Sequence, residues 1–148
     1  MVLYVLLILA IVVCDQLVKM LVVSRIPLNH SVVEVNGILS FAHIRNYGAA
    51  WSSLIGQRWF FFIISVVALA VMIYFFYKKH SDWKYALGLS LMIGGTLGNF
   101  IDRIRLGYVV DMFELDFCNF PIFNVADIAL TFGVIMILIA LLKDDSLA

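Results

Sequence analysis

The chain has 148 residues, of which 64% are hydrophobic and only 14% are charged, and its mean hydropathy is +1.06. Soluble domains have about 45–50% apolar and about 25% charged residues, so too little charge is present to cover a water-soluble surface. Ten basic and ten acidic residues cancel, which gives no charge excess to favour a nucleic-acid partner. The composition therefore predicts an integral membrane protein.

Four apolar segments follow one another along the chain, at residues 2–23, 59–77, 85–101 and 125–142. Each has the length that a helix needs to cross a hydrocarbon core, about 17–25 residues. We therefore predict an all-α integral membrane protein with one membrane domain, residues 1–148, and four transmembrane helices.

Four crossings place both termini on one face of the membrane and the connections 24–58 and 102–124 on the other face. The short connection at residues 78–84 carries three lysines, which favours the cytoplasmic side under the positive-inside rule. Five arginines would then lie on the outer side: Arg25, Arg45, Arg58, Arg103 and Arg105. Counting basic residues alone thus favours neither orientation strongly.

The long connection has the pattern of a β-hairpin. Residues 31–35 and 38–45 are rich in Val, Ile and Phe, and they flank Asn36-Gly37, a dipeptide typical of type I′ turns. Residues 108–117 also read as a strand, which Pro121 ends. These patterns predict a small sheet at the membrane surface.

Polar residues gather at the same face of the membrane as these connections. Ionisable side chains in membrane spans are costly and point to function. The cluster consists of Asp15, Lys19, Asn99, Asp102, Arg103, Asp111, Asn124 and Asp127.

Several of these residues also have structural interpretations. Asp15 and Lys19 have the i,i+4 spacing of a helical ion pair, and we take their role to be structural. Asn99, Asp102 and Arg103 share a helical face, which is compatible with a salt bridge inside the helix, and Arg103 could extend towards lipid headgroups.

Asp127 and Asp111 differ in how well a structural role explains them. Asn124 is placed to cap the last helix and Asp127 to favour its positive end, so capping and catalysis both account for Asp127. Asp111 is a lone carboxylate in the apolar run Val109-Val110-Asp111-Met112-Phe113, where no nearby motif explains it.

Other chemistries find no support in the sequence. His30, His43 and His80 lack zinc-ligand spacing, and neither a Gly-x-Ser-x-Gly elbow nor a phosphate-binding glycine loop is present. We therefore predict neither a metal nor a cofactor, and carboxylates remain as the chemical groups.

Five motifs in order along the chain resemble lipoprotein signal peptidase, the type II signal peptidase of bacteria: residues 15–19, 46–51, 94–103, 110–111 and 123–127. The resemblance covers nearly the whole chain, and five matches together are highly specific. Ala50-Trp51 stands where many members have Ala-Phe, which exchanges one aromatic residue for another.

The resemblance implies an aspartic endopeptidase that cleaves prolipoproteins just before a diacylglyceryl-modified cysteine. It implies four transmembrane helices with an extracytoplasmic β-cradle, in the bacterial cytoplasmic membrane, with both termini cytoplasmic and the active site at the extracytoplasmic face. The expected partners are prolipoprotein substrates and membrane phospholipid, with no nucleic acid and no obligate protein partner.

Carried over by residue, the resemblance makes Asp111 and Asp127 the catalytic pair. It implies that Asn46, Asn99, Arg103 and Asn124 line the active site, and that Asp15, Lys19 and Asp102 give structural support.

Two neighbouring carboxylates do not both ionise cheaply, so we expect them to share one proton. We expect Asp127, at a helix N-terminus, to be the anion and Asp111 to hold the proton. We also expect Trp51 and the β-rich loop to clamp the substrate.

Two other functions remain open from the residues alone. A presenilin-type protease requires Gly-x-Gly-Asp, whereas Tyr108-Val109-Val110 precedes Asp111. A small ion-coupled carrier typically has broken helices or repeats near the midplane, whereas the polar residues here gather at one surface.

Overall fold

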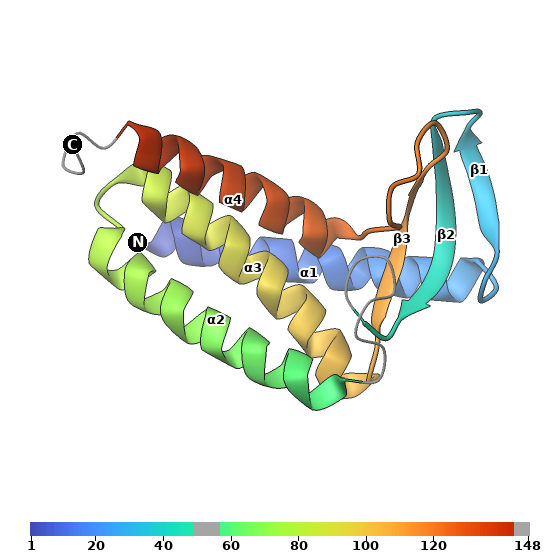
Figure 1. Cartoon of the computed structure of the whole chain (residues 1–148), viewed down its shortest axis with the longest axis horizontal. Helices are drawn as coiled ribbons and strands as arrows, with labels where there is room; N and C mark the ends of the chain where they lie inside the picture. The colour runs from blue at the N-terminus through green and yellow to red at the C-terminus, as the bar shows by residue number, and fades with distance from the viewer. Residues whose placement is uncertain (49–56, 144–148) are drawn as a thin grey trace.

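The computed structural model describes residues 1–48 and 57–143. Within these ranges the chain forms four helices, α1 (Val2–Arg25), α2 (Arg58–Lys79), α3 (Trp83–Arg105) and α4 (Val125–Leu142). It also forms three strands, β1 (Ser31–Val35), β2 (Leu39–Asn46) and β3 (Val109–Leu115). Figure 1 shows the helices side by side in a bundle with the sheet at one end, and the N-terminus and the α2–α3 connection at the other. The predicted class, a mainly helical chain with a small sheet, is confirmed.

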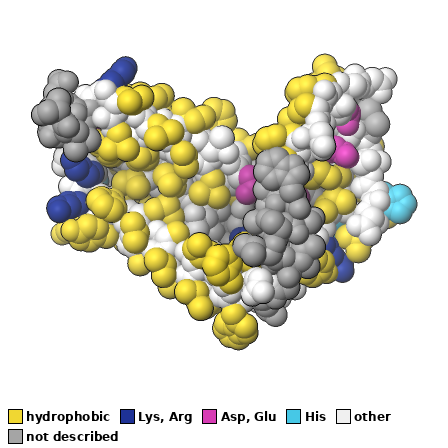
Figure 2. All heavy atoms as spheres, in the orientation of Figure 1, with side chains coloured by type: hydrophobic (Ala, Val, Ile, Leu, Met, Phe, Trp, Pro, Cys, Tyr) yellow, Lys and Arg dark blue, Asp and Glu magenta, His cyan; other side chains and the backbone are white. Residues whose placement is uncertain are grey.

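The apolar surface of the bundle indicates a hydrocarbon environment. Among the described residues, α1, α2 from Trp59 onwards and α4 are long and apolar enough to cross a membrane. Only 17–28% of the residues in their most apolar stretches are buried inside the protein. Figure 2 shows hydrophobic side chains spread over the bundle. Such a surface is stable only in lipid, so the chain is a membrane protein.

Helix α3 is the most polar helix and the most enclosed. It has 23 residues, a length that suffices for a crossing, but it falls short of the hydropathy of the other three. Its polar residues Asn99 and Asp102 are buried against its neighbours rather than facing outward. That α3 forms the fourth crossing therefore stays a prediction.

Glycines on α3 allow it to approach α1 and α4 closely. A Cβ at Gly95 would collide with the carbonyl oxygen of Ala126 on α4, and one at Gly98 would lie 2.7 Å from Asp15 Oδ2 on α1. Small residues permit this approach of membrane helices. The close contact brings polar ends of all three helices together.

The sheet is antiparallel, in the order β1-β2-β3. Ser31 pairs with Ala42, and Ile44 of β2 pairs with Asp111 of β3. Val22 of α1 and Ile26, which follows the helix, form a buried cluster with Val110 and Met112 of β3. This cluster fixes the sheet to the end of α1.

The predicted type I′ turn at Asn36-Gly37 is wrong. Gly37 has a φ of 72°, but Asn36 is not among the positive-φ residues, and the turn closes with a bond from Ile38 N–H to Val35 C=O. A type I′ turn requires positive φ at both central residues. The pairing register of β1 with β2 shifts between Val33 and Val35. Such an irregularity increases the local twist of the strands, which here takes the place of the twist that a type I′ turn would supply.

The chain after β3 folds back onto this strand. Phe123 O accepts hydrogen bonds from the amides of Met112 and Phe113, and Phe123 N–H donates to Phe113 O. Asn124, the residue before α4, is thereby held beside Asp111. This return brings together the two motifs that contain Asp111 and Asp127, residues that lie 16 positions apart in the sequence.

Candidate active site

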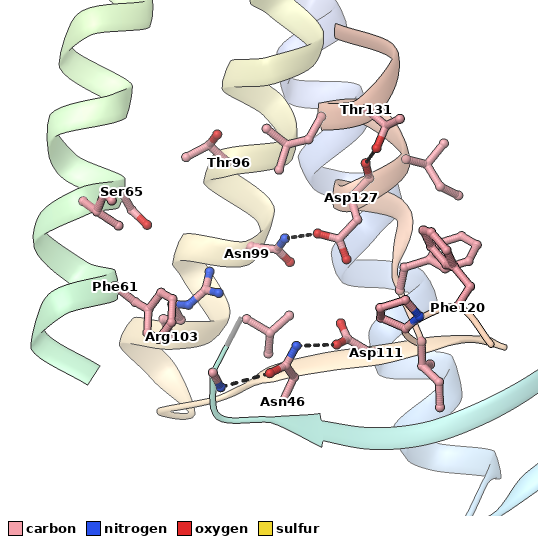
Figure 3. A pocket seen from close by; sticks show the side chains of 18 of the residues that line it. Asn46, Phe61, Ser65, Thr96, Asn99, Arg103, Asp111, Phe120, Asp127 and Thr131 are labelled. Carbon is pink, nitrogen blue, oxygen red and sulfur yellow. Dashed lines mark hydrogen bonds between the residues drawn. The ribbon is translucent and has the colours of Figure 1, made fainter. Parts of the chain in front are cut away.

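A cavity of about 700 Å³ lies where the bundle meets the sheet. Figure 3 shows its wall built from α2, α3, α4, β2 and β3, with Asp111 and Asp127 at its polar end. Away from the aspartates the wall is mostly apolar, with hydroxyls of Ser65, Thr96 and Thr131 interspersed. The cavity thus joins a small polar centre to a larger apolar space.

Asp111 enters the cavity from β3 and is only 3% exposed. Its Oδ2 accepts a hydrogen bond from Asn46 Nδ2 at 2.9 Å, and its Oδ1 accepts one from Asn124 Nδ2 at 2.6 Å. Burial, followed by the nearby charge of Asp127, raises the pKa of Asp111 to about 7, and the two amide donors oppose this rise. Asp111 can therefore hold or release a proton near neutral pH.

Asp127 enters the cavity from the first turn of α4. Its Oδ1 accepts a hydrogen bond from Asn99 Nδ2 at 2.7 Å, and its Oδ2 accepts one from Asn124 N–H at 3.1 Å. Asp127 N–H in turn donates to Asn124 Oδ1 at 2.9 Å. Asn124 and Asp127 therefore form a capping box, and the predicted capping is confirmed. The same contacts aim the carboxylate at the cavity, so capping and a place in the site do not exclude each other.

Asn99 and Asn124 connect the two aspartates. Asn124 Nδ2 donates to Asn99 Oδ1 at 3.0 Å as well as to Asp111. Asn124 is fully buried and lies behind the cavity wall, whereas Asn46 and Asn99 reach its surface. The residues predicted to line the site therefore lie together in the structure. Asn124, however, contacts Asp111 from behind the cavity wall and does not itself line the cavity.

Arg103 lines the cavity from α3. Its guanidinium lies 5.0 Å from the centre of the Phe61 ring on α2. Asp127 and Asp111 act on it electrostatically as nearby negative charges. Arg103 thus places positive charge beside the two carboxylates.

Asp15, Lys19 and Asp102 form a buried ion-pair group next to this site. Lys19 Nζ lies 2.8 Å from Asp15 Oδ2, which confirms the predicted i,i+4 pair, and 3.0 Å from Asp102 Oδ2. Asp102 therefore pairs across to Lys19 of α1. Gln16 Nε2 also donates to Asp102 Oδ1 at 2.9 Å.

Sequence reasoning assigned no role to several residues at the site. Gln16 stood out as polar within an apolar segment, and this was a usable signal. Phe61 carried none, because it is one of many apolar residues in α2 and the inward face of that helix is set by packing. The cavity hydroxyls of Ser65, Thr96 and Thr131 were not singled out either. Trp51, predicted to clamp the substrate, lies outside the described residues.

The described ranges contain no group of three or more His, Cys, Asp or Glu side chains that could hold a metal. A metal-free site stays a prediction. The arrangement itself offers acid–base chemistry: two carboxylates at one cavity with fixed amide donors can share a proton, activate water and protonate a leaving group.

Residues 7–143 match the family described as Signal peptidase (SPase) II. The chain is 57% identical over 143 residues to the "Lipoprotein signal peptidase" of Lactiplantibacillus plantarum, covering 97% of this chain and 96% of that protein. It is 51% identical over 146 residues to the protein of the same name from Latilactobacillus sakei, covering 98% and 97%. A solved bacterial membrane enzyme structure superposes with a TM-score of 0.92 at 40% identity, covering 97% of this chain and 89% of that one.

Proposed function

Since the chain belongs to the signal peptidase II family, we propose that it removes signal peptides from prolipoproteins by an aspartic mechanism centred on Asp111 and Asp127. The family makes it a membrane protease that processes lipoproteins. The identity of the catalytic pair, the cleavage position and the orientation in the membrane are our proposals.

One observation carries the aspartic mechanism. Asp111 and Asp127 come from different elements, β3 and α4, yet both face one cavity, and each receives hydrogen bonds on both carboxylate oxygens. A structural carboxylate would more simply pair with a cation, as Asp15 does with Lys19. The presenilin-type and carrier interpretations gain no comparable support.

The surroundings of the two carboxylates differ, and this supports a division of roles. Asp127 lies in the first turn of α4, where the helix dipole favours negative charge. Asp111 is nearly fully buried, and its pKa near 7 keeps the proton on it below that pH. We propose that Asp127 is the anion and Asp111 the acid of the shared-proton pair.

The reaction follows from these roles. The Asp127 carboxylate takes a proton from a water molecule, whose oxygen attacks the carbonyl carbon of the scissile peptide bond. The Asp111 proton moves to the carbonyl oxygen and gives a neutral tetrahedral intermediate. Asp127 then donates its proton to the leaving nitrogen, the C–N bond breaks, and Asp111 recovers its proton from the intermediate.

The apolar part of the cavity suits a lipid-modified substrate. Its wall includes Phe61, Ile64 and Leu130, which provide a surface compatible with acyl chains. We propose that the diacylglyceryl group of the substrate cysteine lies here. Cleavage then takes place just before that cysteine, at the polar end of the cavity.

The orientation is proposed from charge and position. Lys78, Lys79 and Lys84 lie at the α2–α3 end of the bundle, opposite the sheet and the aspartates. The positive-inside rule favours that end for the cytoplasm. Both termini are then cytoplasmic and the site faces outward from the cytoplasmic membrane, beside phospholipid. We propose no cofactor and no obligate protein partner.

One end of the sheet contacts Asp111, and the loop that carries Trp51 comes next in the sequence. The contact is made by Asn46, at which β2 ends. We propose that this loop clamps the peptide over the two aspartates.

The test uses the purified full-length protein in lipid vesicles with a diacylglyceryl-modified prolipoprotein, and measures the released signal peptide. Asp111→Asn and Asp127→Asn should each abolish release while the protein stays folded. Asp116→Asn is the matched control, because Asp116 is an exposed carboxylate on the same connection that bonds Ser40. Normal cleavage by either of the first two variants would contradict the proposed pair.

A further inference from the structure

We propose that Lys19 is a positioning residue for the reaction, whose single ammonium ties together the two chain segments that present Asp111 and Asp127. This inference rests on the proposed roles of these aspartates. The inference gives Lys19 a role beyond stabilising a helix, because each of its three contacts connects it, through a neighbouring side chain, to Asp111 or Asp127.

The first contact leads to Asp127. Lys19 Nζ lies 2.8 Å from Asp15 Oδ2, and the other oxygen of Asp15 accepts a hydrogen bond from Ala126 N–H at 3.0 Å. Ala126 immediately precedes Asp127 in α4. Asp15 is wholly buried, so water does not substitute for either contact.

The second contact leads to Asp111 in the same way. Lys19 Nζ lies 3.0 Å from Asp102 Oδ2, which also accepts a hydrogen bond from Val110 N–H at 3.1 Å. Val110 immediately precedes Asp111 in β3. On both sides a buried carboxylate that is bound to Lys19 thus holds the amide of the residue before a catalytic aspartate.

The third contact sets the orientation of Asn99. Lys19 Nζ donates to Asn99 Oδ1 at 3.0 Å, which leaves Asn99 Nδ2 to donate to Asp127 Oδ1 at 2.7 Å. A rotated amide would place its NH₂ group against the ammonium. Lys19 therefore fixes which end of this amide faces Asp127.

The number of hydrogens on the ammonium and the burial of Lys19 both fit this positioning role. It has three hydrogens, and the three oxygens that receive them come from Asp15, Asp102 and Asn99. Lys19 is 3% exposed. Without it, two buried carboxylates would face each other across the space that the ammonium occupied, and their repulsion would separate the segments that they hold.

The charge of Lys19 also reaches the catalytic pair, since it lowers the pKa of Asp111 against the larger raising effects of burial and Asp127. Arg45 of β2 is directed to the Tyr108 ring, 4.8 Å from its centre. Among the described residues, the charged groups on the helices packed against the pair are Asp15 and Lys19 on α1 and Asp102 and Arg103 on α3.

The experiment compares Lys19→Met, Lys19→Arg and the exposed control Lys78→Met in the full-length protein, with kcat measured per folded molecule between pH 5 and 9. We expect Lys19→Met to lower kcat by about 100-fold, as misplacement of catalytic groups by about 1 Å does, with little change in KM. The alkaline limb of its pH profile should move to higher pH, because a positive charge near Asp111 is lost. Lys19→Arg should keep the limb at the wild-type position.

A second variant keeps the proposal testable if Lys19→Met does not fold. Asp15→Asn combined with Lys19→Met removes one charge of each sign and retains an oxygen at position 15 for Ala126 N–H. We expect this protein to fold, with lowered kcat and faster hydrogen exchange at Ala126 and Val110. A folded Lys19→Met or double variant with wild-type kcat and an unmoved alkaline limb would overturn the inference.

The same assay separates this inference from the proposed function. Cleavage by Asp111→Asn or Asp127→Asn would refute the catalytic pair, whatever the Lys19 variants do. The hydrogen-exchange measurement needs no activity. Unchanged exchange at both amides in the double variant would refute the role of Lys19 independently of the reaction.

Discussion

Asn99 donates a 2.7 Å hydrogen bond from Nδ2 to Asp127 Oδ1, although the two residues are 28 positions apart on different helices. The Oδ1 atom of Asn99 accepts from Lys19 Nζ and from Asn124 Nδ2. Both donors draw electron density from the amide and strengthen its N–H as a donor. The contact favours the ionised form of Asp127, in agreement with the role of anion that we propose for it.

We therefore expect Asn99→Leu to impair the chemistry more than the fold. The variant keeps most of the side-chain volume but removes the donor to Asp127 and the acceptor of Lys19. Loss of one oriented donor typically lowers kcat by about 10²–10³-fold, and we expect a decrease of this order. The assay is single-turnover cleavage, with Asn36→Leu at the exposed turn as the control. Equal kcat in the two variants would exclude the role.

The pH dependence of cleavage should follow the proton on Asp111. Burial and the charge of Asp127 raise the pKa of Asp111 from 3.8 to about 7. Below that pH Asp111 holds the proton that the mechanism needs, and above it the proton is lost, so kcat/KM should fall as the pH rises through about 7. A pH–rate profile of the wild type measures this, and Asp116→Asn should give the same limb. Activity that stays level up to pH 9 would contradict Asp111 as the acid.

Two substitutions at Asn124 should separate its capping role from its bridging role. Asn124→Ala removes the cap of α4 and the donor to Asp111, and the loss of the cap alone costs about 1 kcal/mol of stability. Asn124→Ser retains a capping oxygen but no amide donor. We expect Ser to recover much of the unfolding temperature lost with Ala, and both variants to cleave poorly. Recovery of cleavage with Ser would show that the cap alone matters.

The helices and strands could be predicted from the sequence because each depends on a local pattern. Apolar runs of sufficient length predicted the bundle, and the Val- and Ile-rich segments predicted the sheet within about a residue at most ends. The turn type predicted for Asn36-Gly37 was wrong because the register of the two strands selected a different turn. The dipeptide alone does not determine that register.

The site could be predicted only where its members are polar residues in apolar surroundings. Asp111, Asp127 and Asn99 carried this signal. Their connections did not, because the contacts of Asp15 with Ala126 and of Asp102 with Val110 are made to backbone amides. Any residue carries such an amide, so only the three-dimensional structure identifies which one is bound.

The packing of α3 leads to a graded prediction for three glycine-to-alanine variants. A methyl group at Gly95 would collide with the backbone carbonyl of Ala126, and at Gly98 it would lie 2.7 Å from Asp15 Oδ2. At Gly88 the two nearest atoms, 2.9 and 3.0 Å away, belong to the flexible Ile137 side chain, and the nearest backbone atom, Gly133 O, lies at 3.1 Å, farther than Ala126 O lies from a methyl group at Gly95.

A backbone atom cannot rotate aside, so Gly95→Ala should separate α3 from α4 and lower the unfolding temperature the most. Gly98→Ala should displace Asp15 from Ala126 and reduce cleavage beyond its effect on stability, whereas Gly88→Ala should be mild in both respects. Thermal unfolding and cleavage per folded molecule measure the series in the same detergent. A Gly88→Ala variant as damaged as Gly95→Ala would contradict the assignment, because flexible and rigid neighbours would then have equal effects.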